Sequence, residues 1–377
     1  MSVDDIPEPD LVEGAPHPRH TPNLFGQTAA EQTFLQAYNG GRLHHGWLIS
    51  GPRGVGKATL AWKIARFLLS QPDGGAGGMF GADPALADTL DTDPNLPVAR
   101  RVSALAEPRF LLCRRPWDDK RSRLKQEITV DEVRKLKSFF NLSAADGGRR
   151  VVIIDAADEM NTSAANALLK ILEEPPEKAT LLLVSHRPLS LLPTIRSRCR
   201  TLPCASLDAD DMTRALSAAG FAPEGDATHL ATLANGSVGE AIRLMSHDGL
   251  KLYNVLIRLV ARAPGMERPA LLTLAESCTG KAGGPRYDIT LRLIGILMHR
   301  LALTGVSGPP SPEAAEGESG ALAALSPSPS AARRWAELAQ VLSDRSSHAR
   351  AVNLDPASVI LDMLLKIDQT AGSLRAA

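Results

Sequence analysis

Short apolar runs alternate with longer amphipathic stretches over the first 205 residues of the chain. In the amphipathic stretches, apolar residues recur with the helical period, as do Ala165, Leu168 and Leu172. Continuous apolar runs between such helices predict strands that are buried on both faces of a parallel sheet. The pattern therefore predicts an α/β fold, an αβα sandwich with helices on both faces of the sheet. The expected strands lie at 47–49, 110–113, 151–155, 180–185 and 200–203.

The pattern changes after residue 205, where only the helical period continues. Shorter helices at 208–219, 227–234 and from 237 onward predict a small helical lid over 206–247. Longer helices predict an all-α domain over 248–377. Within that domain, residues 304–330 are rich in Gly, Pro, Ser and Glu, a composition that predicts a flexible loop. The longer helices are expected at 250–263, 269–278, 289–303, 331–343 and 356–370.

Two further segments depart from the periodic pattern. Residues 1–22 are polar and proline-rich, and they predict a flexible N-terminal arm before a domain at 23–205. Residues 71–108 contain a glycine-rich stretch with scattered Asp and Pro. This composition predicts an insertion within the sandwich, with some helix near 98–106.

Composition excludes several classes of protein. The 377 residues include 42 Lys and Arg and 42 Asp and Glu, so the formal net charge is zero. This balance argues against a protein that coats nucleic acid unaided. Four cysteines without C-x-x-C spacing predict reduced thiols and neither disulfides nor a zinc site. Because we find neither a signal-peptide core nor a run of about 18 apolar residues, we expect a cytoplasmic protein without a membrane span.

One local cluster of positive charge stands out from this balance. Lys120, Arg121, Arg123 and Lys125 lie close together in the charged segment 118–125. The segment is either a solvated loop or a contact to nucleic-acid phosphate. The sequence leaves both interpretations open.

A glycine-rich loop follows the first apolar run and precedes a helix. A strand, such a loop and a helix are the context that a phosphate-binding loop requires. The glycines let backbone N–H groups surround a phosphate, and the helix N-terminus adds a partial positive charge. Lys57 is expected to contact the outer phosphates. The sequence thus predicts nucleotide binding by Gly51, Gly54, Val55, Gly56, Lys57, Ala58 and Thr59.

The residues needed for hydrolysis are incomplete. Asp155 ends a buried strand at the sheet edge that also carries the loop, where it is expected to hold Mg²⁺ directly or through water. Ala58 stands where the loop motif requires a Ser or Thr hydroxyl. Ala156 stands where an ATPase of this class has the glutamate that polarises water, and Glu159 is poorly placed to replace it.

Taken in order, the motifs of this chain resemble those of the clamp-loader branch of the AAA+ ATPases. The most specific part is N-A-L-L-K-I-L-E-E-P-P at 166–176, followed about twenty residues later by S-R-C at 197–199. The resemblance is clear over about 20–205, weaker over the lid, and over the last helices rests mainly on their order and length. The other motifs are L-F-G-Q at 24–27, R-L-H-H at 42–45, the glycine-rich loop, and I-I-D at 153–155.

The resemblance implies an AAA+ P-loop domain, a helical lid and a C-terminal collar that joins five subunits into a ring. It implies a part in DNA replication, with the motor subunits (gamma/tau) and the delta subunit as partners. The sliding clamp and primed DNA are reached through the complex, and no membrane is involved. Arg198 matches the arginine of the S-R-C motif, which in this family enters the ATP site of the next subunit as a catalytic arginine finger.

Three departures from the family pattern concern the chain's own ATP site. Ala58 and Ala156 replace two groups named above, and Gly239 stands where the lid arginine is expected. The four-cysteine zinc module of many relatives is missing, because 71–108 contains no cysteine, so no bound metal is expected. These departures predict a subunit that holds ATP without hydrolysing it and gives Arg198 to a neighbouring ATPase of the DNA polymerase III holoenzyme. By itself such a subunit is not catalytic.

Two alternatives remain at this level. The chain is an active motor subunit if Thr59 and Glu159 replace the missing groups. It is a pure scaffold if its P-loop is a relic that no longer binds nucleotide.

Overall fold

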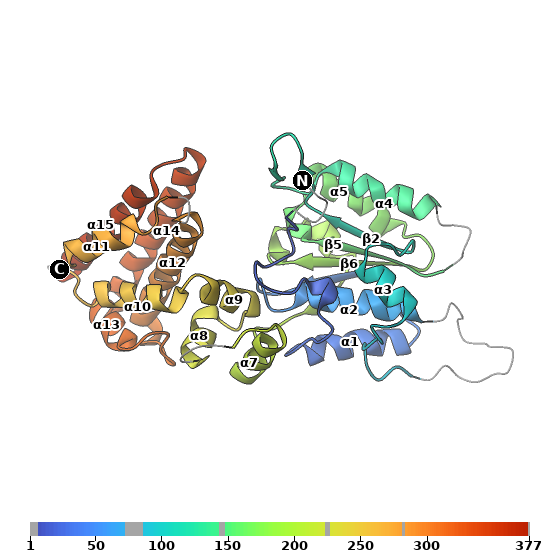
Figure 1. Cartoon of the computed structure of the whole chain (residues 1–377), viewed down its shortest axis with the longest axis horizontal. Helices are drawn as coiled ribbons and strands as arrows, with labels where there is room; N and C mark the ends of the chain where they lie inside the picture. Colours follow the sequence, from blue (N-terminus) through green and yellow to red (C-terminus); the bar gives the residue numbers. More distant parts are fainter. Residues whose placement is uncertain (1–6, 72–85, 143–147, 223–226, 281–282, 376–377) are drawn as a thin grey trace. The chain divides into compact units, whose positions relative to one another are not determined.

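The computed structural model describes residues 7–71, 86–142, 148–222, 227–280 and 283–375. The chain forms two compact units (Figure 1). The first comprises Met1–Ala222 and Gly236–Gly239, and the second comprises Pro223–Asn235 and Glu240–Ala377. The segment 206–247, expected as one lid, contributes to both units.

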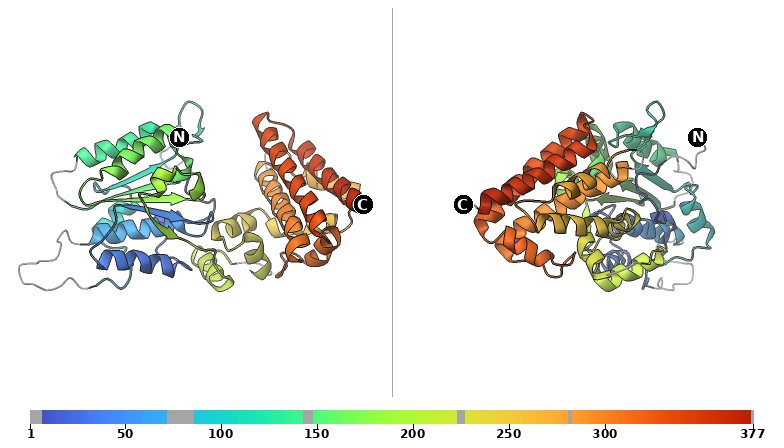
Figure 2. Two further views of the ribbon diagram at one scale, coloured as in Figure 1. Left: turned by 180° about the vertical axis from the view of Figure 1, so that it is seen from behind. Right: turned by 60° about the vertical axis from the view of Figure 1, so that its left-hand side comes forward.

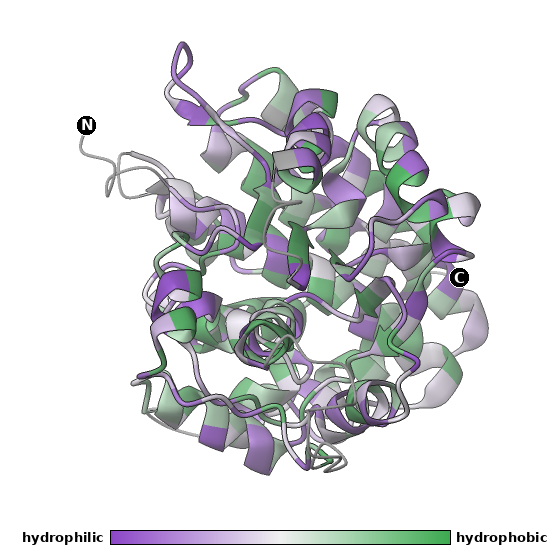
Figure 3. Ribbon diagram, turned by 90° about the vertical axis from the view of Figure 1, so that its right-hand side faces the viewer, coloured by the Kyte–Doolittle hydropathy of each residue, from purple (hydrophilic) through white to green (hydrophobic). Residues whose placement is uncertain are grey.

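A five-stranded parallel sheet forms the centre of the first unit, in the order β2-β5-β6-β1-β7. All residues of β1, β5 and β6 are buried, as continuous apolar runs require. In Figure 3 the strands in the interior are coloured largely as hydrophobic. The strands are β1 (Gly46–Ser50), β2 (Phe110–Arg114), β5 (Arg150–Asp155), β6 (Ala179–Ser185) and β7 (Arg200–Pro203).

Helices cover both faces of this sheet. Because successive side chains of a strand point to opposite faces, Val151 and Ile153 join one core while Val152 and Ile154 join the other. The αβα sandwich predicted from the sequence is therefore confirmed (Figure 1). One face carries α1 (Thr28–Asn39), α2 (Lys57–Ser70) and α3 (Pro97–Ser103), and the other carries α4 (Val130–Leu142), α5 (Thr162–Glu173) and α6 (Pro193–Arg196).

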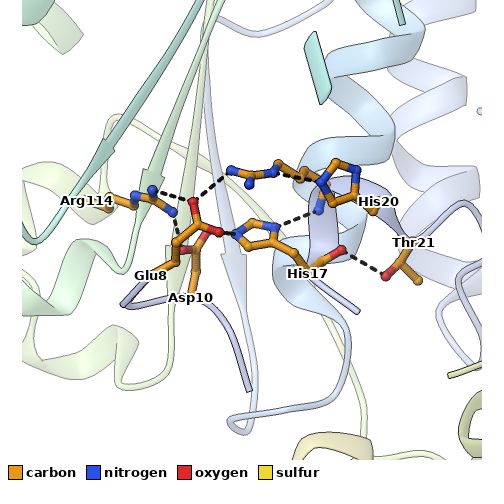
Figure 4. A network of polar contacts seen from close by, with 7 residues as sticks. Glu8, Asp10, His17, His20, Thr21 and Arg114 are labelled. Atoms are coloured by element: carbon orange, nitrogen blue, oxygen red, sulfur yellow. Dashed lines mark hydrogen bonds and ion pairs between the residues drawn. The ribbon is translucent and has the colours of Figure 1, made fainter. Parts of the chain in front are cut away.

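The N-terminal arm differs from the flexible segment that its composition predicts. From Glu8 to Thr21 it is held by a network of charged side chains (Figure 4). His17 is buried, and its Nε2 lies 3.1 Å from Asp10 Oδ2 and 3.2 Å from Glu8 Oε2. Arg114, the last residue of β2, contacts both carboxylates. Polar composition cannot distinguish a solvated arm from one whose charges are paired.

The insertion expected at 71–108 is described only in part, because 72–85 lies outside the described residues. Its later part is packed on the sandwich: Leu90 and Val102 are fully buried, and α3 contacts α2. The helix expected near 98–106 is α3, which begins at Pro97 and ends at Ser103.

The basic segment forms a small antiparallel hairpin of β3 (Trp117–Asp118) and β4 (Arg123–Leu124). Its four cations are exposed. The geometry agrees with either interpretation of this segment, a solvated loop or a phosphate contact. Among its described residues the first unit also contains α7 (Ala209–Ala218) and the short 3-10 helices η2 (Pro18–His20), η3 (Ala157–Glu159) and η4 (Pro188–Ser190).

The second unit is helical in all of its described elements. Helix α12 lies along α14, and α11 lies along α15 (Figure 2). Helix α9 (Val238–Ser246) begins in the first unit and continues in this one. The other helices are α8 (Ala227–Ala234), α10 (Gly249–Val260), α11 (Arg268–Glu276), α12 (Gly283–Ser307), α13 (Glu318–Leu325), α14 (Pro329–Ala351) and α15 (Pro356–Arg375).

The flexible loop expected at 304–330 is instead ordered around a buried carboxylate. Glu318, at the start of α13, is fully buried. Its carboxylate accepts hydrogen bonds from the Tyr253 hydroxyl at 2.6 Å, from the Arg300 guanidinium at 2.6 and 2.9 Å, and from the Ala314 N–H at 2.6 Å. Buried charges persist when they are fully paired, so composition alone misjudged this segment.

Among the described residues, α12 is the one helix that is long and apolar enough to cross a membrane by length and composition. Half of its most apolar stretch is buried inside the structure. Its neighbours are α14, α10, α13 and α15. The helix expected at 289–303 lies within α12, and its apolar stretch is thus in large part a packing surface of the second unit.

Candidate functional site

The carboxyl ends of three adjacent strands meet at one edge of the sheet. The P-loop follows β1, and Asp155 is the last residue of β5. Ser185 is the last residue of β6, and His186 follows it. The register pairs Ser50 with Ser185 and Asp155 with Val184, so these ends lie side by side. Ligands of open parallel sheets bind at this edge. The structure thus brings the predicted P-loop and Asp155 into one site.

The backbone of the P-loop depends on its glycines. Gly51, Gly54 and Gly56 have φ angles of 147°, 80° and 97°, a region that side-chain-bearing residues rarely adopt. A Cβ at Gly51 would overlap the Cys204 carbonyl oxygen. Val55 between them is buried and anchors the loop in the core. This conformation brings the loop backbone close to any group bound at the sheet edge.

Lys57 is the first residue of α2 and lies inside the loop. Its side chain is almost fully buried, and its Nζ donates hydrogen bonds to the carbonyl oxygens of Gly51, at 2.8 Å, and Pro52. Burial lowers the pKa of Lys57 to about 8. Ala58 and Thr59 follow on α2 and are half-buried. Because one residue turns a helix by about 100°, Thr59 does not stand where the motif hydroxyl would stand.

Asp155 lies in an acidic environment. It is buried, and burial together with the charges of Asp10 and Glu159 raises its pKa to about 7. Near neutral pH this carboxyl is therefore only partly ionised. Asp10 belongs to the N-terminal arm, so the arm contributes to the electrostatics of the site. Nothing in the sequence indicates that the charge of Asp10 acts on Asp155.

Glu159 forms an ion pair with Arg115. It lies in η3, four residues after Asp155, and its Oε2 lies 2.7 Å from Arg115 Nε. Burial raises its pKa, although the charge of Arg115 opposes this rise. The contact with Arg115 occupies Oε2 of Glu159. The arrangement therefore does not support Glu159 as a replacement for the glutamate that Ala156 lacks.

Asp158 and His186 form a second polar pair at the same edge. The His186 backbone N–H donates to Asp158 Oδ1 at 2.8 Å. Burial opposes ionisation of Asp158, but this hydrogen bond and the other polar contacts of Asp158 together outweigh it and hold the pKa of Asp158 below its ordinary value. Burial and the charge of Lys57 lower the pKa of His186 to about 4. A neutral His186 can form a hydrogen bond at the site but carries no charge there.

The lid position expected to carry an arginine lies directly on the P-loop. The Gly239 N–H donates to the Gly54 carbonyl oxygen at 3.1 Å, and the Ser237 hydroxyl donates to the Arg53 carbonyl oxygen at 2.8 Å. A Cβ at Gly239 would lie 3.1 Å from Gly54 Cα and 3.4 Å from Val12 Cγ2. This close approach leaves little room for a Cβ, and position 239 has no side chain that could reach a phosphate.

Arg198 is not part of this site. It follows α6 and precedes β7, so it lies at the amino-terminal edge of the sheet, where β1 begins at Gly46. The P-loop lies at the other end of β1, about 16 Å away for five residues at 3.3 Å each. The Arg198 side chain is 36% exposed, and its guanidinium contacts Glu173 Oε1 at 2.9 Å and the Thr194 carbonyl oxygen at 3.1 Å.

Gly46 and Glu173 are the residues around Arg198 that sequence reasoning missed. A Cβ at Gly46 would lie 3.2 Å from the Arg198 carbonyl oxygen and 3.3 Å from Cys199 Sγ. The absence of a side chain at Gly46 thus lets the S-R-C turn approach the start of β1. Glu173 belongs to the quoted segment 166–176 and Gly46 directly follows the quoted segment 42–45, but no spacing rule linked them to Arg198.

The site fits the phosphates of a nucleotide better than it fits Mg²⁺. The glycine backbone and Lys57 provide the donors that phosphates require. Ala58 offers no side-chain oxygen as a ligand, which leaves the Asp155 carboxylate as the metal ligand expected from the sequence. Among the described residues no group of three or more His, Cys, Asp or Glu side chains could hold a metal ion.

Comparisons with known proteins show which proteins this chain is similar to. A family model described as "DNA polymerase III, delta subunit" matches residues 26–208. Over 191 residues the chain is 37% identical to DNA polymerase III subunit delta' of Pseudomonas aeruginosa, which covers 49% of this chain and 52% of that protein. Over 277 residues it is 32% identical to DNA polymerase III subunit gamma/tau of Mycobacterium tuberculosis, which covers 72% of this chain and 40% of that protein.

The chain is similar to the delta' and gamma/tau subunits of DNA polymerase III. It spans about half the length of the delta' relative it matches. Among solved structures, a gamma-subunit-related protein of Thermotoga maritima is similar with 16% identity and a TM-score of 0.38, over 90% of this chain and 99% of that one. The AAA+ type of P-loop sandwich is supported by the sheet order and the position of the loop.

The region matched by the family model lies within the first unit. The matched region 26–208 contains the P-loop, Asp155 and Arg198. It ends where the sheet of the first unit ends. The family model therefore covers the residues at both edges of the sheet, while the helices of the second unit lie outside it.

Proposed function

We propose that this chain is a non-hydrolysing subunit of the clamp loader of the DNA polymerase III holoenzyme. In this proposal it supplies Arg198 in trans to the ATP site of a neighbouring subunit. The observation that carries the proposal is the place of Arg198, exposed at the sheet edge opposite the chain's own P-loop. Arg198 and the chain's own P-loop lie at opposite ends of β1, a strand about 16 Å long, so Arg198 is placed to act on a phosphate in another subunit.

The chain's own site supports the first half of the proposal. Gly51, Gly54, Val55, Gly56 and Lys57 form a phosphate cradle, so ATP is held there without turnover. No step of hydrolysis is assigned to this site, because the oxygen ligand at position 58 is missing. The water-activating group at position 156 is missing too, and Glu159 is paired with Arg115.

The partners follow from the same proposal. The chain would sit in a five-subunit ring with the motor subunits (gamma/tau) and the delta subunit, in the cytoplasm. The sliding clamp and primed DNA would be reached through this complex during replication. The helices of the second unit would form the collar that joins the subunits. In the transition state Arg198 would donate hydrogen bonds to the neighbour's γ-phosphate oxygens and stabilise the charge that develops there.

The test is a comparison of hydrolysis in the assembled complex. Hydrolysis is confined to the neighbouring subunit by substituting the P-loop lysine of the other motor subunits. With Arg198→Ala, we expect kcat for that site to fall by about 10³-fold or more, the usual contribution of an arginine finger. Arg187→Ala is the matched control, because Arg187 is equally basic, 74% exposed and located at the other sheet edge.

Each alternative has a distinct outcome. An unchanged rate with Arg198→Ala refutes the finger. Steady-state hydrolysis by the purified chain that is lost with Lys57→Ala would establish an active motor subunit instead. Calorimetry with ATP and Mg²⁺ that shows no saturable binding would indicate a scaffold with a relic P-loop.

A further inference from the structure

Arg198 is held by a carboxylate at the end of α5, and we propose that Glu173 is its positioning residue. In this view Glu173 fixes the guanidinium in the orientation that meets the neighbour's ATP. The inference rests on the proposed function, because it assigns a role to a second residue of the same site.

The contact is made by two segments of the family signature. Glu173 is the last residue of α5 and belongs to the L-E-E-P-P stretch, whereas Arg198 belongs to S-R-C. The distance from Arg198 Nη2 to Glu173 Oε1 is 2.9 Å, and Nη1 donates to the Thr194 carbonyl oxygen at 3.1 Å. The guanidinium is thus held through both terminal nitrogens, and three of its five N–H donors face away from these contacts.

The placement of Glu173 is unfavourable for α5 taken alone. The C-terminus of a helix carries a partial negative charge, so acidic side chains there are destabilising. Here two adjacent glutamates, Glu173 and Glu174, end the helix before Pro175. An acidic residue that destabilises the end of its own helix, with no contact inside that helix to offset the cost, points to a functional role. The guanidinium of Arg198 supplies the compensating charge for Glu173.

The backbone brings the two residues together independently of their charges. A Cβ at Gly46 would lie 3.1 Å from Leu172 Cδ2 and 3.2 Å from the Arg198 carbonyl oxygen. Gly46 therefore allows the end of α5 and the S-R-C turn to pack against the start of β1 at the same point. This packing fixes both backbones. The contact with Glu173 then selects one orientation of the long, flexible Arg198 side chain.

Such a residue changes how often Arg198 is correctly oriented, and leaves its chemistry unchanged. Exposed ion pairs hold a side chain weakly, and the Glu173 side chain is 48% exposed. We therefore expect Glu173→Ala to lower kcat at the neighbouring site by about two- to fivefold. The KM for ATP should not change, because Arg198 acts only in the transition state. Glu173→Gln should give an intermediate rate, since its amide oxygen can still accept a hydrogen bond.

The experiment uses the assembled complex with hydrolysis confined to the neighbouring subunit, and rates are expressed per assembled ring. Glu174→Ala is the matched control, because it removes the same charge from the adjacent position, where the structure shows no ion pair among the described residues. The decisive variant combines Glu173→Ala with Arg198→Ala. If Glu173 acts only through Arg198, the double variant is no slower than Arg198→Ala alone.

The outcomes separate this inference from the proposed function. If Arg198→Ala leaves the rate unchanged, the proposed function is wrong and this inference falls with it. If Arg198→Ala is slow but Glu173→Ala is as fast as the wild type, only the positioning role is overturned. A faster rate with Glu173→Ala, or an equal loss with Glu174→Ala, would also overturn it.

Discussion

The N-terminal arm offers the sharpest test of the charge network in Figure 4. The perturbation is Asp10→Asn, which keeps the shape of the side chain and removes its charge. Asp10 is 2% exposed, its Oδ1 lies 2.6 Å from Arg114 Nη1, and its Oδ2 lies 3.1 Å from His17 Nε2. Hydrogen bonds to charged groups contribute about 1.5–3 kcal/mol. Opening of the arm should thus become about 10- to 150-fold more frequent.

The pH dependence of this effect has a definite sign. Burial opposes ionisation of Asp10, but the hydrogen bond with His17 and the charge of Arg114 hold its pKa below the ordinary value of 3.8. A carboxyl with a lowered pKa in the folded state stabilises that state above its unfolded pKa. The stabilisation is lost as the pH falls through the folded pKa. The two proteins should therefore differ at pH 7 and converge in acid.

The assay is hydrogen exchange of the arm amides. The Arg19 N–H donates to His17 Nδ1 at 3.0 Å, so its exchange reports the opening of this segment. Glu13→Gln is the control, because Glu13 is exposed and lies on the same arm. Equal exchange of wild type and Asp10→Asn at pH 7 would refute the reasoning, as would a similar acceleration in Glu13→Gln.

Two further predictions concern other buried charges. Glu318→Ala should lower the free energy of unfolding by about 3–5 kcal/mol, because it leaves the Arg300 charge uncompensated inside the protein. Urea unfolding of this variant is compared with that of Glu316→Ala, a substitution on the exposed turn. Equal unfolding midpoints of the two variants would contradict the prediction. Because the pKa of Lys57 is about 8, the charged lysine is lost above that pH, so ATP affinity should fall about tenfold between pH 7 and pH 9. Calorimetry at the two pH values checks this prediction, and equal affinities would count against a role for Lys57 in phosphate binding.

Most of the first unit could be predicted from the sequence because its signals are local. A run such as Val152 to Ile154 is apolar at every position, and only a strand buried on both faces requires this. The glycines of the P-loop likewise indicate backbone angles that residues with a side chain rarely adopt, whatever structure surrounds the loop. These local signals also placed the ends of the strands, and therefore Asp155, at the edge that carries the loop.

The charged residues were harder to interpret, because composition is the same for a solvated segment and for a paired one. The arm around His17 and the loop before Glu318 are both polar, and both were expected to be flexible. In the structure each is held by partners distant in the sequence, such as Arg114 for the arm and Tyr253 for the loop. No periodicity records such pairs.

The sequence by itself determined the elements, the sandwich, the P-loop and the candidate arginine, since each depends on residues close together in the chain. Only the tertiary structure decided what these residues can reach. It placed Arg198 at the sheet edge away from the P-loop and against Glu173, and it set Gly239 on Gly54, where a Cβ would lie only 3.1 Å from the Gly54 Cα. Such distances depend on how strands and helices pack, because packing brings together residues that the chain separates.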